Sequence, residues 1–143
     1  MIRVYLDNCS FNRPFDDQES EIIRLEAEAK MMIQERIRVG QMELVWSYFL
    51  EFENEANPDE EVREKIAVWR EIATVIQLET NIIIEKSKAY SDLGLSTQDS
   101  IHIASAIVSN ADYFITTDKG IIKKRNRINE IKIVNPTEFI INE

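Results

Sequence analysis

Residues 2–8 read Ile2-Arg3-Val4-Tyr5-Leu6-Asp7-Asn8, a short run rich in branched and aromatic side chains that ends in two polar residues. This pattern is typical of a strand that leads into a turn. Its polar residues Arg3 and Tyr5 suggest a strand that lies less deeply in the sheet than the others. Further strands are predicted at residues 42–46, 74–78, 113–116 and 131–134.

Segments with helical spacing separate these strands. Asp16 and Asp17 are expected to open a long helix, after a turn-rich loop at residues 10–14, and Gly40 closes it. Ser47 is expected to cap a second helix, and Asn57 followed by Pro58 a third. Further helices are predicted at residues 80–93, 96–108 and 119–127, with a last turn after residue 135.

Strands that alternate with helices predict right-handed crossovers and a mainly parallel sheet. The length of 143 residues suits one domain over residues 1–143. We therefore expect an α/β fold with a five-stranded, mainly parallel sheet and helices on both faces. In such sheets ligands bind beyond the carboxyl ends of the strands. Asp7 follows the first strand and Asp118 the fourth, so both are expected to point into one crevice.

The composition excludes several kinds of site. Cys9 is the only cysteine and His102 the only histidine, so multi-thiolate or multi-imidazole zinc sites are excluded. Any metal site must therefore use mainly oxygen ligands. No apolar run reaches the roughly 18 residues that a membrane span needs. The first residues lack the basic start of a signal peptide, so we expect a cytoplasmic protein without membrane contact.

The formal net charge is −9, which disfavours tight, unassisted binding to long nucleic acids because that affinity comes mainly from Lys and Arg. Residues 119–132 are locally basic, with six Lys or Arg against Glu130. They form either a solvated helix face or a surface that contacts RNA.

Each acidic candidate has a structural alternative. Asp7 could hydrogen-bond its own turn, Asp118 could cap a helix, and Asp99 could complete a capping box with Ser96. Glu53 is placed by periodicity on the border of an apolar stripe formed by residues 49, 52 and 56, where its charge needs a metal or a basic partner. Glu51 and Glu55 are expected to be solvated.

The four carboxylates together indicate more than each does alone. Two strand ends and two helices could bring Asp7, Glu53, Asp99 and Asp118 into one pocket, where like charges repel. One or two Mg²⁺ or Mn²⁺ ions would relieve this repulsion, since these ions prefer oxygen ligands. Such ions can activate water and orient a phosphodiester. The pattern therefore favours metal-dependent hydrolysis of phosphodiester bonds.

Three nearby residues have weaker indications. Cys9 has no evident basic partner and is expected to be a small buried side chain. His102 lies one helical turn from Asp99, where packing or support of the site is favoured over catalysis. Arg13 is either a turn residue or a contact to a substrate phosphate or a site acid.

Four stretches resemble the PIN-domain family, especially toxins of the VapC type. They are VYLDNCSFNRPFDD at 4–17, SYFLEFE at 47–53, LSTQDSIHIA at 95–104 and ADYFITTD at 111–118. The resemblance covers essentially the whole chain, in the family's order and spacing. It implies a PIN fold and a metal-dependent endoribonuclease whose catalytic and metal-binding acids are Asp7, Glu53, Asp99 and Asp118.

The resemblance also implies supporting residues and partners. Asn8, Thr116 and Thr117 would be polar groups near the metal. Separately from the resemblance, Lys119 and Lys123 of the basic segment join Arg13 as candidates for substrate contact. The protein would form a homodimer, act on RNA as the toxin of a toxin–antitoxin pair, and be neutralised by a small antitoxin that inserts a basic side chain among the acids.

Three other interpretations stay open. The chain could be an RNA-processing PIN nuclease or a PIN scaffold kept only for binding. A phosphoryl-accepting receiver domain has similar alternation, but it would need a lysine after the fifth strand, where Asn135 stands, and would leave Glu53 unexplained.

Overall fold

The five predicted strands form a single parallel sheet in the computed structural model, which describes residues 1–143. Its strands lie in the order β3-β2-β1-β4-β5, and every neighbouring pair is parallel. They are β1 (Arg3–Leu6), β2 (Glu43–Ser47), β3 (Val75–Gln77), β4 (Tyr113–Ile115) and β5 (Lys132–Val134). The expected α/β architecture is confirmed.

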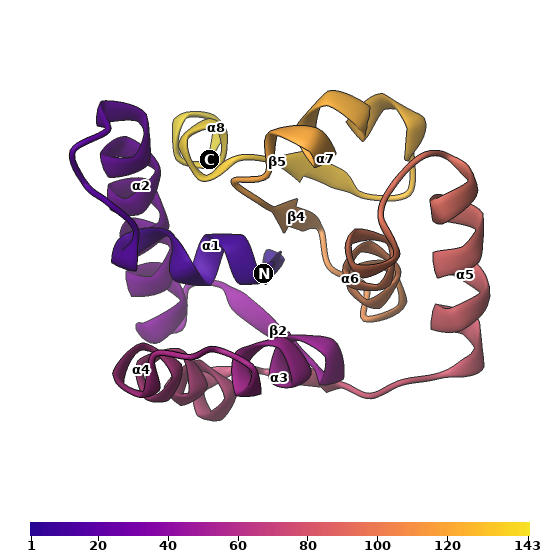
Figure 1. The fold of residues 1–143 in the computed structure, drawn as a ribbon, viewed down its shortest axis with the longest axis horizontal. Coiled ribbons are helices and arrows are strands. Elements are labelled where there is room, and N and C mark those ends of the chain that lie inside the picture. Colours follow the sequence, from indigo (N-terminus) through magenta and orange to yellow (C-terminus); the bar gives the residue numbers. More distant parts are fainter.

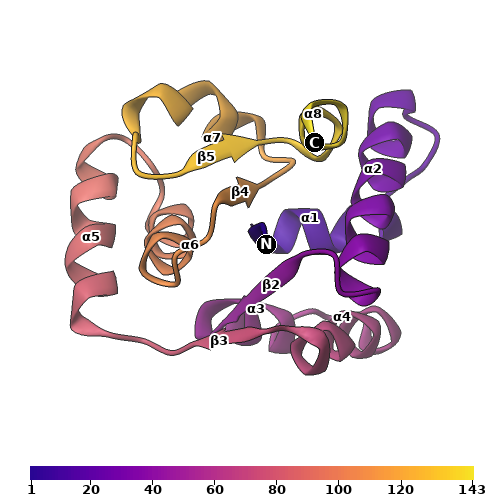
Figure 2. The ribbon, with the colours of Figure 1, turned by 180° about the vertical axis from the view of Figure 1, so that it is seen from behind.

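Helices cover both faces of this sheet (Figures 1 and 2). One side carries α2 packed against α8, and the other carries α6 with α5 outside it. The helices are α1 (Asn8–Asn12), α2 (Glu21–Arg38), α3 (Tyr48–Glu55), α4 (Glu60–Ile72), α5 (Asn81–Asp92), α6 (Thr97–Val108), α7 (Lys119–Lys124) and α8 (Pro136–Asn142), with short 3-10 turns η1 (Arg13–Phe15) and η2 (Arg125–Arg127). None of them is long and apolar enough to cross a membrane.

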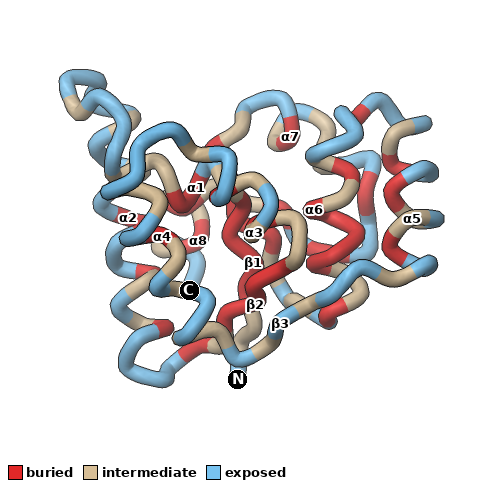
Figure 3. The backbone as a smooth tube through the Cα atoms, turned by 60° about the horizontal axis from the view of Figure 1, so that its bottom comes forward, coloured by how far each residue is buried: buried red, intermediate tan, exposed pale blue.

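The central strand is β1, not a shallow one as its polar residues suggested. Val4, Tyr5 and Leu6 are fully buried, and β1 and β2 form the buried centre of the molecule in Figure 3. Arg3 tolerates its place because its side chain pairs with Glu43 on β2, 2.8 Å away. The Tyr5 hydroxyl is hydrogen-bonded inside the core. A central strand can therefore carry polar groups where neighbouring elements supply partners.

Two helix starts differ from the prediction. The long helix begins after Ser20, whose hydroxyl accepts the backbone N–H of Ile23, and not at Asp16 or Asp17. The preceding residues, assigned to a loop, instead form α1 and η1. Asp59 caps α4 in place of Asn57.

The strand order separates this fold from a receiver domain. Receiver-like doubly wound sheets have the order 2-1-3-4-5, in which the first strand lies between the second and third. Here β1 lies between β2 and β4, and β3 lies at the edge. The receiver interpretation is therefore wrong for this chain.

Helix α2 buries only part of its apolar stripe. Ala29, Ile33 and Ile37 belong to the buried core, whereas Ile22 and Leu25 nearer the start of the same helix are 59% and 48% exposed. The first half of α2 thus presents apolar side chains to solvent.

We predict that Leu44→Ala destabilises the protein by about 2–5 kcal/mol, because Leu44 is fully buried in β2 and its removal leaves a cavity. Leu78→Ala is the matched control, since Leu78 is 66% exposed and should change the free energy of unfolding by less than about 0.5 kcal/mol. Urea unfolding measures both. Equal losses would contradict the described core.

Candidate functional site

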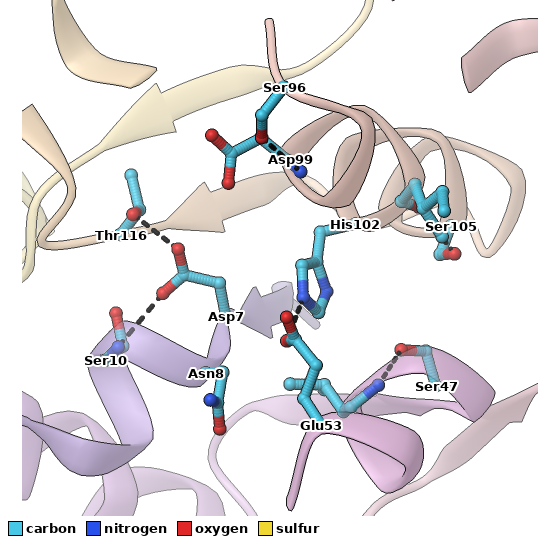
Figure 4. A network of polar contacts seen from close by, with 12 residues as sticks. Asp7, Asn8, Ser10, Ser47, Glu53, Ser96, Asp99, His102, Ser105 and Thr116 are labelled. Atoms are coloured by element: carbon cyan, nitrogen blue, oxygen red, sulfur yellow. Dashed lines mark hydrogen bonds and ion pairs between the residues drawn. The ribbon is translucent and has the colours of Figure 1, made fainter. Parts of the chain in front are cut away.

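Asp7 stands at the carboxyl end of β1, where it also caps α1, and it is almost fully buried. Its Oδ1 accepts the backbone N–H of Ser10 at 3.0 Å, and its Oδ2 accepts the Thr116 hydroxyl at 2.5 Å (Figure 4). Burial raises the pKa of Asp7 to about 6, although both hydrogen bonds act in the opposite direction. Asp7 therefore hydrogen-bonds its own turn, as the structural alternative expected, and its carboxylate is also strongly desolvated.

Thr116 connects the carboxylate of Asp7 to Asp118, the acid that follows β4. Its hydroxyl oxygen, which donates to Asp7, also accepts the backbone N–H of Asp118 at 3.0 Å. The Oδ1 of Asp118 caps α7 by accepting the N–H groups of Gly120 and Ile121, while its Oδ2 has no hydrogen-bond partner. Asp118 is therefore a helix cap with one carboxylate oxygen still available.

Asp99 lies in the first turn of α6, half-buried. Its N–H donates to the Ser96 hydroxyl at 3.1 Å, but its carboxylate makes no return bond to the Ser96 N–H, so only half of the expected capping box forms. Burial raises the pKa of Asp99, and the charges of Asp118 and Glu53 raise it further. The Ser96 side chain acts in the opposite direction, and the pKa of this carboxyl still remains raised.

Glu53 projects from α3 toward α6, and its Oε1 lies 2.5 Å from Nε2 of His102. The predicted stripe was wrong: Phe52 is 64% exposed, and α3 instead buries Leu50 and Asn54. The imidazole of His102 is the polar partner of this carboxylate.

Glu51 is not the solvated residue that the pattern suggested. Its carboxylate accepts the indole N–H of Trp46 at 2.9 Å and pairs with Arg70 at 3.3 Å. Glu55 is exposed as expected.

His102 is buried, and both of its ring nitrogens are engaged. Nε2 meets Glu53, while Nδ1 lies 2.6 Å from the hydroxyl of Tyr5, which in turn lies 2.6 Å from Oγ of Ser47. The expectation that His102 packs or supports the site agrees with this geometry. Tyr5 and Ser47 were missed as site residues; the available signal was a tyrosine hydroxyl on a strand that must find a partner when buried.

The four acids gather at the carboxyl edge of the sheet. Figure 4 shows Asp7, Glu53 and Asp99 around one space, to which they come from different elements. Partial burial, followed by the charges of all four carboxylates, raises the pKa of the Cys9 thiol to about 12. Cys9 is exposed, contrary to the expected buried side chain. No three His, Cys, Asp or Glu side chains lie close enough to hold one ion as they stand.

The supporting polar residues differ in their surroundings. Asn8 is half-buried, and its side-chain oxygen accepts from Asn12. Thr117 is buried, and its hydroxyl has no hydrogen-bond partner, which is uncommon for a buried polar atom. Thr117 lines a hollow of about 270 Å³ together with Lys119 and Lys123.

Arg13 is held by acids outside the four. Its guanidinium pairs with Asp16 at 3.1 Å and with Glu26 at 3.5 Å. Asp16 follows η1 and Glu26 is on α2, so Arg13 links η1 to α2 in this structure.

Most of the basic segment at residues 119–132 has structural partners. Lys124 and Arg127 donate to the backbone oxygens of Gly94 and Leu93, and Arg125 pairs with Glu138. Lys119 and Lys123 are exposed and make no ion pair. Only part of the segment is therefore free to meet a ligand.

Three solved structures resemble this fold closely. FitAcB from Neisseria gonorrhoeae shares 12% sequence identity, with a TM-score of 0.61 over 93% of this chain and 97% of that one. VapBC-1 from nontypeable Haemophilus influenzae shares 17%, with a TM-score of 0.62 over 95% and 99%. VapBC2 from Rickettsia felis, bound to a DNA fragment from its promoter, shares 15%, with a TM-score of 0.55 over 94% and 98%.

No protein-family model matches this sequence, and no curated protein matches it either. At identities of 12–17%, the likeness to the solved structures concerns the fold. The chain has the PIN-like, VapC-type fold that the four sequence stretches predicted.

We predict that the metal-free protein loses stability as the pH rises from about 4 to about 6, because Asp7 must ionise while buried. The pKa of Asp7 in the folded state, about 6, exceeds the ordinary value of 3.8, so the folded state binds this proton more tightly than the unfolded state does. The resulting contribution to the free energy of unfolding is present at low pH and is lost as the pH rises to about 6. The loss from this group amounts to about 3 kcal/mol.

The side chain introduced by Asp7→Asn does not titrate in this range. Comparison with this variant therefore separates the contribution of Asp7 from that of the other acids. Urea unfolding in a chelating buffer at pH 4 and pH 7 should show wild type losing stability relative to Asp7→Asn. Parallel pH profiles for the two proteins would contradict the description of a destabilised carboxylate.

Proposed function

We propose that this chain, which has a VapC-type PIN fold, is a metal-dependent endoribonuclease that hydrolyses RNA phosphodiester bonds and acts as the toxin of a toxin–antitoxin pair. The observation that carries the proposal is the gathering of Asp7, Glu53, Asp99 and Asp118 at the carboxyl edge of the sheet, where ligands bind in such folds.

The donor set fits Mg²⁺ or Mn²⁺. Asp7, Asp99, Asp118 and the Glu53 oxygen that His102 leaves free supply hard oxygen ligands, and His102 has no free ring nitrogen. Mg²⁺ usually binds through one or two carboxylates and keeps several waters, so it does not require three acids in contact beforehand. One or two ions would relieve the repulsion among these acids and the cost of the buried charge of Asp7.

The bound ion would activate water and polarise the scissile phosphodiester. The chain's own residues have separate tasks. Asp7 is held rigidly by Thr116 and Ser10, so it fixes the position of the site relative to the sheet. Asp99 is half-buried in the first turn of α6, from which its carboxylate would meet the ion.

A short RNA segment fits the surroundings better than a long one. Lys119 and Lys123 line the hollow beside Thr117 and can contact a phosphate next to the acids. Phe52, exposed on α3 next to Glu53, offers a face on which a base can stack. Because the net charge of the whole chain, −9, opposes polyanions, recognition would depend on these local contacts and on RNA shape.

The partner would be a small antitoxin protein. Ile22 and Leu25 leave an apolar surface on α2, and such surfaces mark sites of protein association. The four acids would attract a basic side chain, and a guanidinium would offset their charge as a metal does. A homodimer of the chain belongs to the same proposal.

We predict that Asp7→Asn, Glu53→Gln, Asp99→Asn and Asp118→Asn each lower the rate of RNA cleavage about 100-fold or more in the presence of Mg²⁺ or Mn²⁺. A chelator should abolish cleavage by the wild type. The measurement is cleavage of a set of short structured RNAs, with thermal melting to check that each variant is folded.

Glu55→Gln is the control for this series, because Glu55 is exposed on the same helix as Glu53. Glu51→Gln is unsuitable, since it would disturb Trp46 and Arg70. If Glu55→Gln reduced cleavage as much as Glu53→Gln, the effect would not be specific to the four acids.

We further predict that induced expression slows growth and that Asp7→Asn removes this effect. Co-expression of a small protein encoded next to this chain should restore growth and copurify with it. Normal growth with active enzyme, and no copurifying neighbour, would favour an RNA-processing nuclease; a chain without cleavage would favour a PIN scaffold kept for binding.

A further inference from the structure

A chain of short hydrogen bonds runs through the core to Glu53. It links Ser47 at the end of β2, Tyr5 on β1, His102 on α6 and Glu53 on α3. The separations are 2.6 Å, 2.6 Å and 2.5 Å, and Ser47, Tyr5 and His102 are buried. These elements are far apart in sequence, so the contacts exist only in the folded protein.

The proton positions in this chain have one consistent arrangement. Ser47 Oγ already accepts the backbone N–H of Leu50 at 3.1 Å. If Tyr5 also donated to Ser47, the Ser47 hydroxyl hydrogen would be buried without an acceptor, which is costly. Ser47 therefore donates to Tyr5, and Tyr5 donates to Nδ1 of His102.

This direction determines the tautomer of His102. With Nδ1 acting as an acceptor, the ring proton is on Nε2, where it points at Oε1 of Glu53. The opposite neutral tautomer would place a nitrogen lone pair against the carboxylate. Burial raises the pKa of the Tyr5 hydroxyl well above its usual range, which keeps this donor protonated.

We propose that Ser47, Tyr5 and His102 are positioning residues that hold one oxygen of Glu53 by a single, directed hydrogen bond and leave its other oxygen for the metal. This inference rests on the proposed function, because it concerns how Glu53 meets the ion. Groups that orient a metal-binding carboxylate commonly change affinity 10–100-fold when they are removed.

The same arrangement keeps His102 out of the metal's own ligand set. Both ring nitrogens are occupied, and Phe49 packs edge-on against the ring with 5.0 Å between centroids. The site therefore stays an oxygen site, which suits Mg²⁺ or Mn²⁺ better than Zn²⁺.

The tautomer can be measured without any metal. His102 is the only histidine, so the imidazole signals of a ¹⁵N-labelled sample belong to it alone. Correlation spectra of the metal-free protein at pH 7 should show a proton on Nε2 and none on Nδ1. A proton on Nδ1, alone or together with Nε2, would overturn the proposed chain.

The positioning role is tested with Tyr5→Phe, which removes one hydroxyl and keeps the ring. The Nδ1 signal of His102 should then shift because this nitrogen loses its hydrogen-bond donor, the dissociation constant for Mn²⁺ by calorimetry should rise about 10-fold, and kcat should fall more than KM changes. His102→Gln, which retains an N–H donor but cannot receive the Tyr5 proton at the same position, should bind Mn²⁺ with intermediate affinity. Melting curves confirm that both variants fold.

Tyr113→Phe is the matched control, since its hydroxyl contacts Glu143 at the opposite end of the sheet. It should leave the His102 spectrum and Mn²⁺ affinity unchanged. If wild type binds Mn²⁺ and Tyr5→Phe binds it equally well, the positioning role is wrong and the proposed function stands. If wild type binds no Mn²⁺, the proposed function is wrong, and the metal-free spectrum still decides the hydrogen-bond chain.

Discussion

The burial of one carboxylate, that of Asp7, governs the arrangement around it. A charged group at the end of the central strand is costly unless other groups stabilise it, and here Thr116 from β4 and the backbone of Ser10 both donate to it. These two bonds connect β1 to the turn before α7 and to the start of α1. The positions of Asp118 and of the first short helix therefore follow from the need to satisfy Asp7.

The hydrogen bonds do not offset the whole cost, because the pKa of Asp7 remains raised to about 6. Asp99 experiences a similar penalty, from its burial and from the neighbouring charges of Asp118 and Glu53. Under the proposed function, a bound cation would relieve this repulsion, and that relief would add to its binding energy.

Some basic side chains bind acids or backbone oxygens of the fold, and others are exposed without an ion pair. Arg13 is paired with Asp16 and Glu26, while Lys124, Arg125 and Arg127 bind backbone oxygens or Glu138. Lys119 and Lys123 are the two basic side chains that line the hollow beside Thr117, which Glu26 also lines. In an acidic protein, so few unpaired basic side chains limit the attraction for polyanions in general.

The sequence by itself determined the α/β class and the approximate strand positions, because strand and helix periodicities are local and the strands are bounded by clear turn residues. The PIN-like fold was predicted from the resemblance of four short stretches to that family. The sequence also singled out the four acids. Only the tertiary structure placed β1 at the centre, exposed Phe52, and attached Glu51 to Trp46. In a short helix with aromatic residues on several sides, spacing does not identify the buried face. The bonds from Tyr5 to His102 and from His102 to Glu53 join residues 97 and 49 positions apart, and no local pattern specifies such pairs.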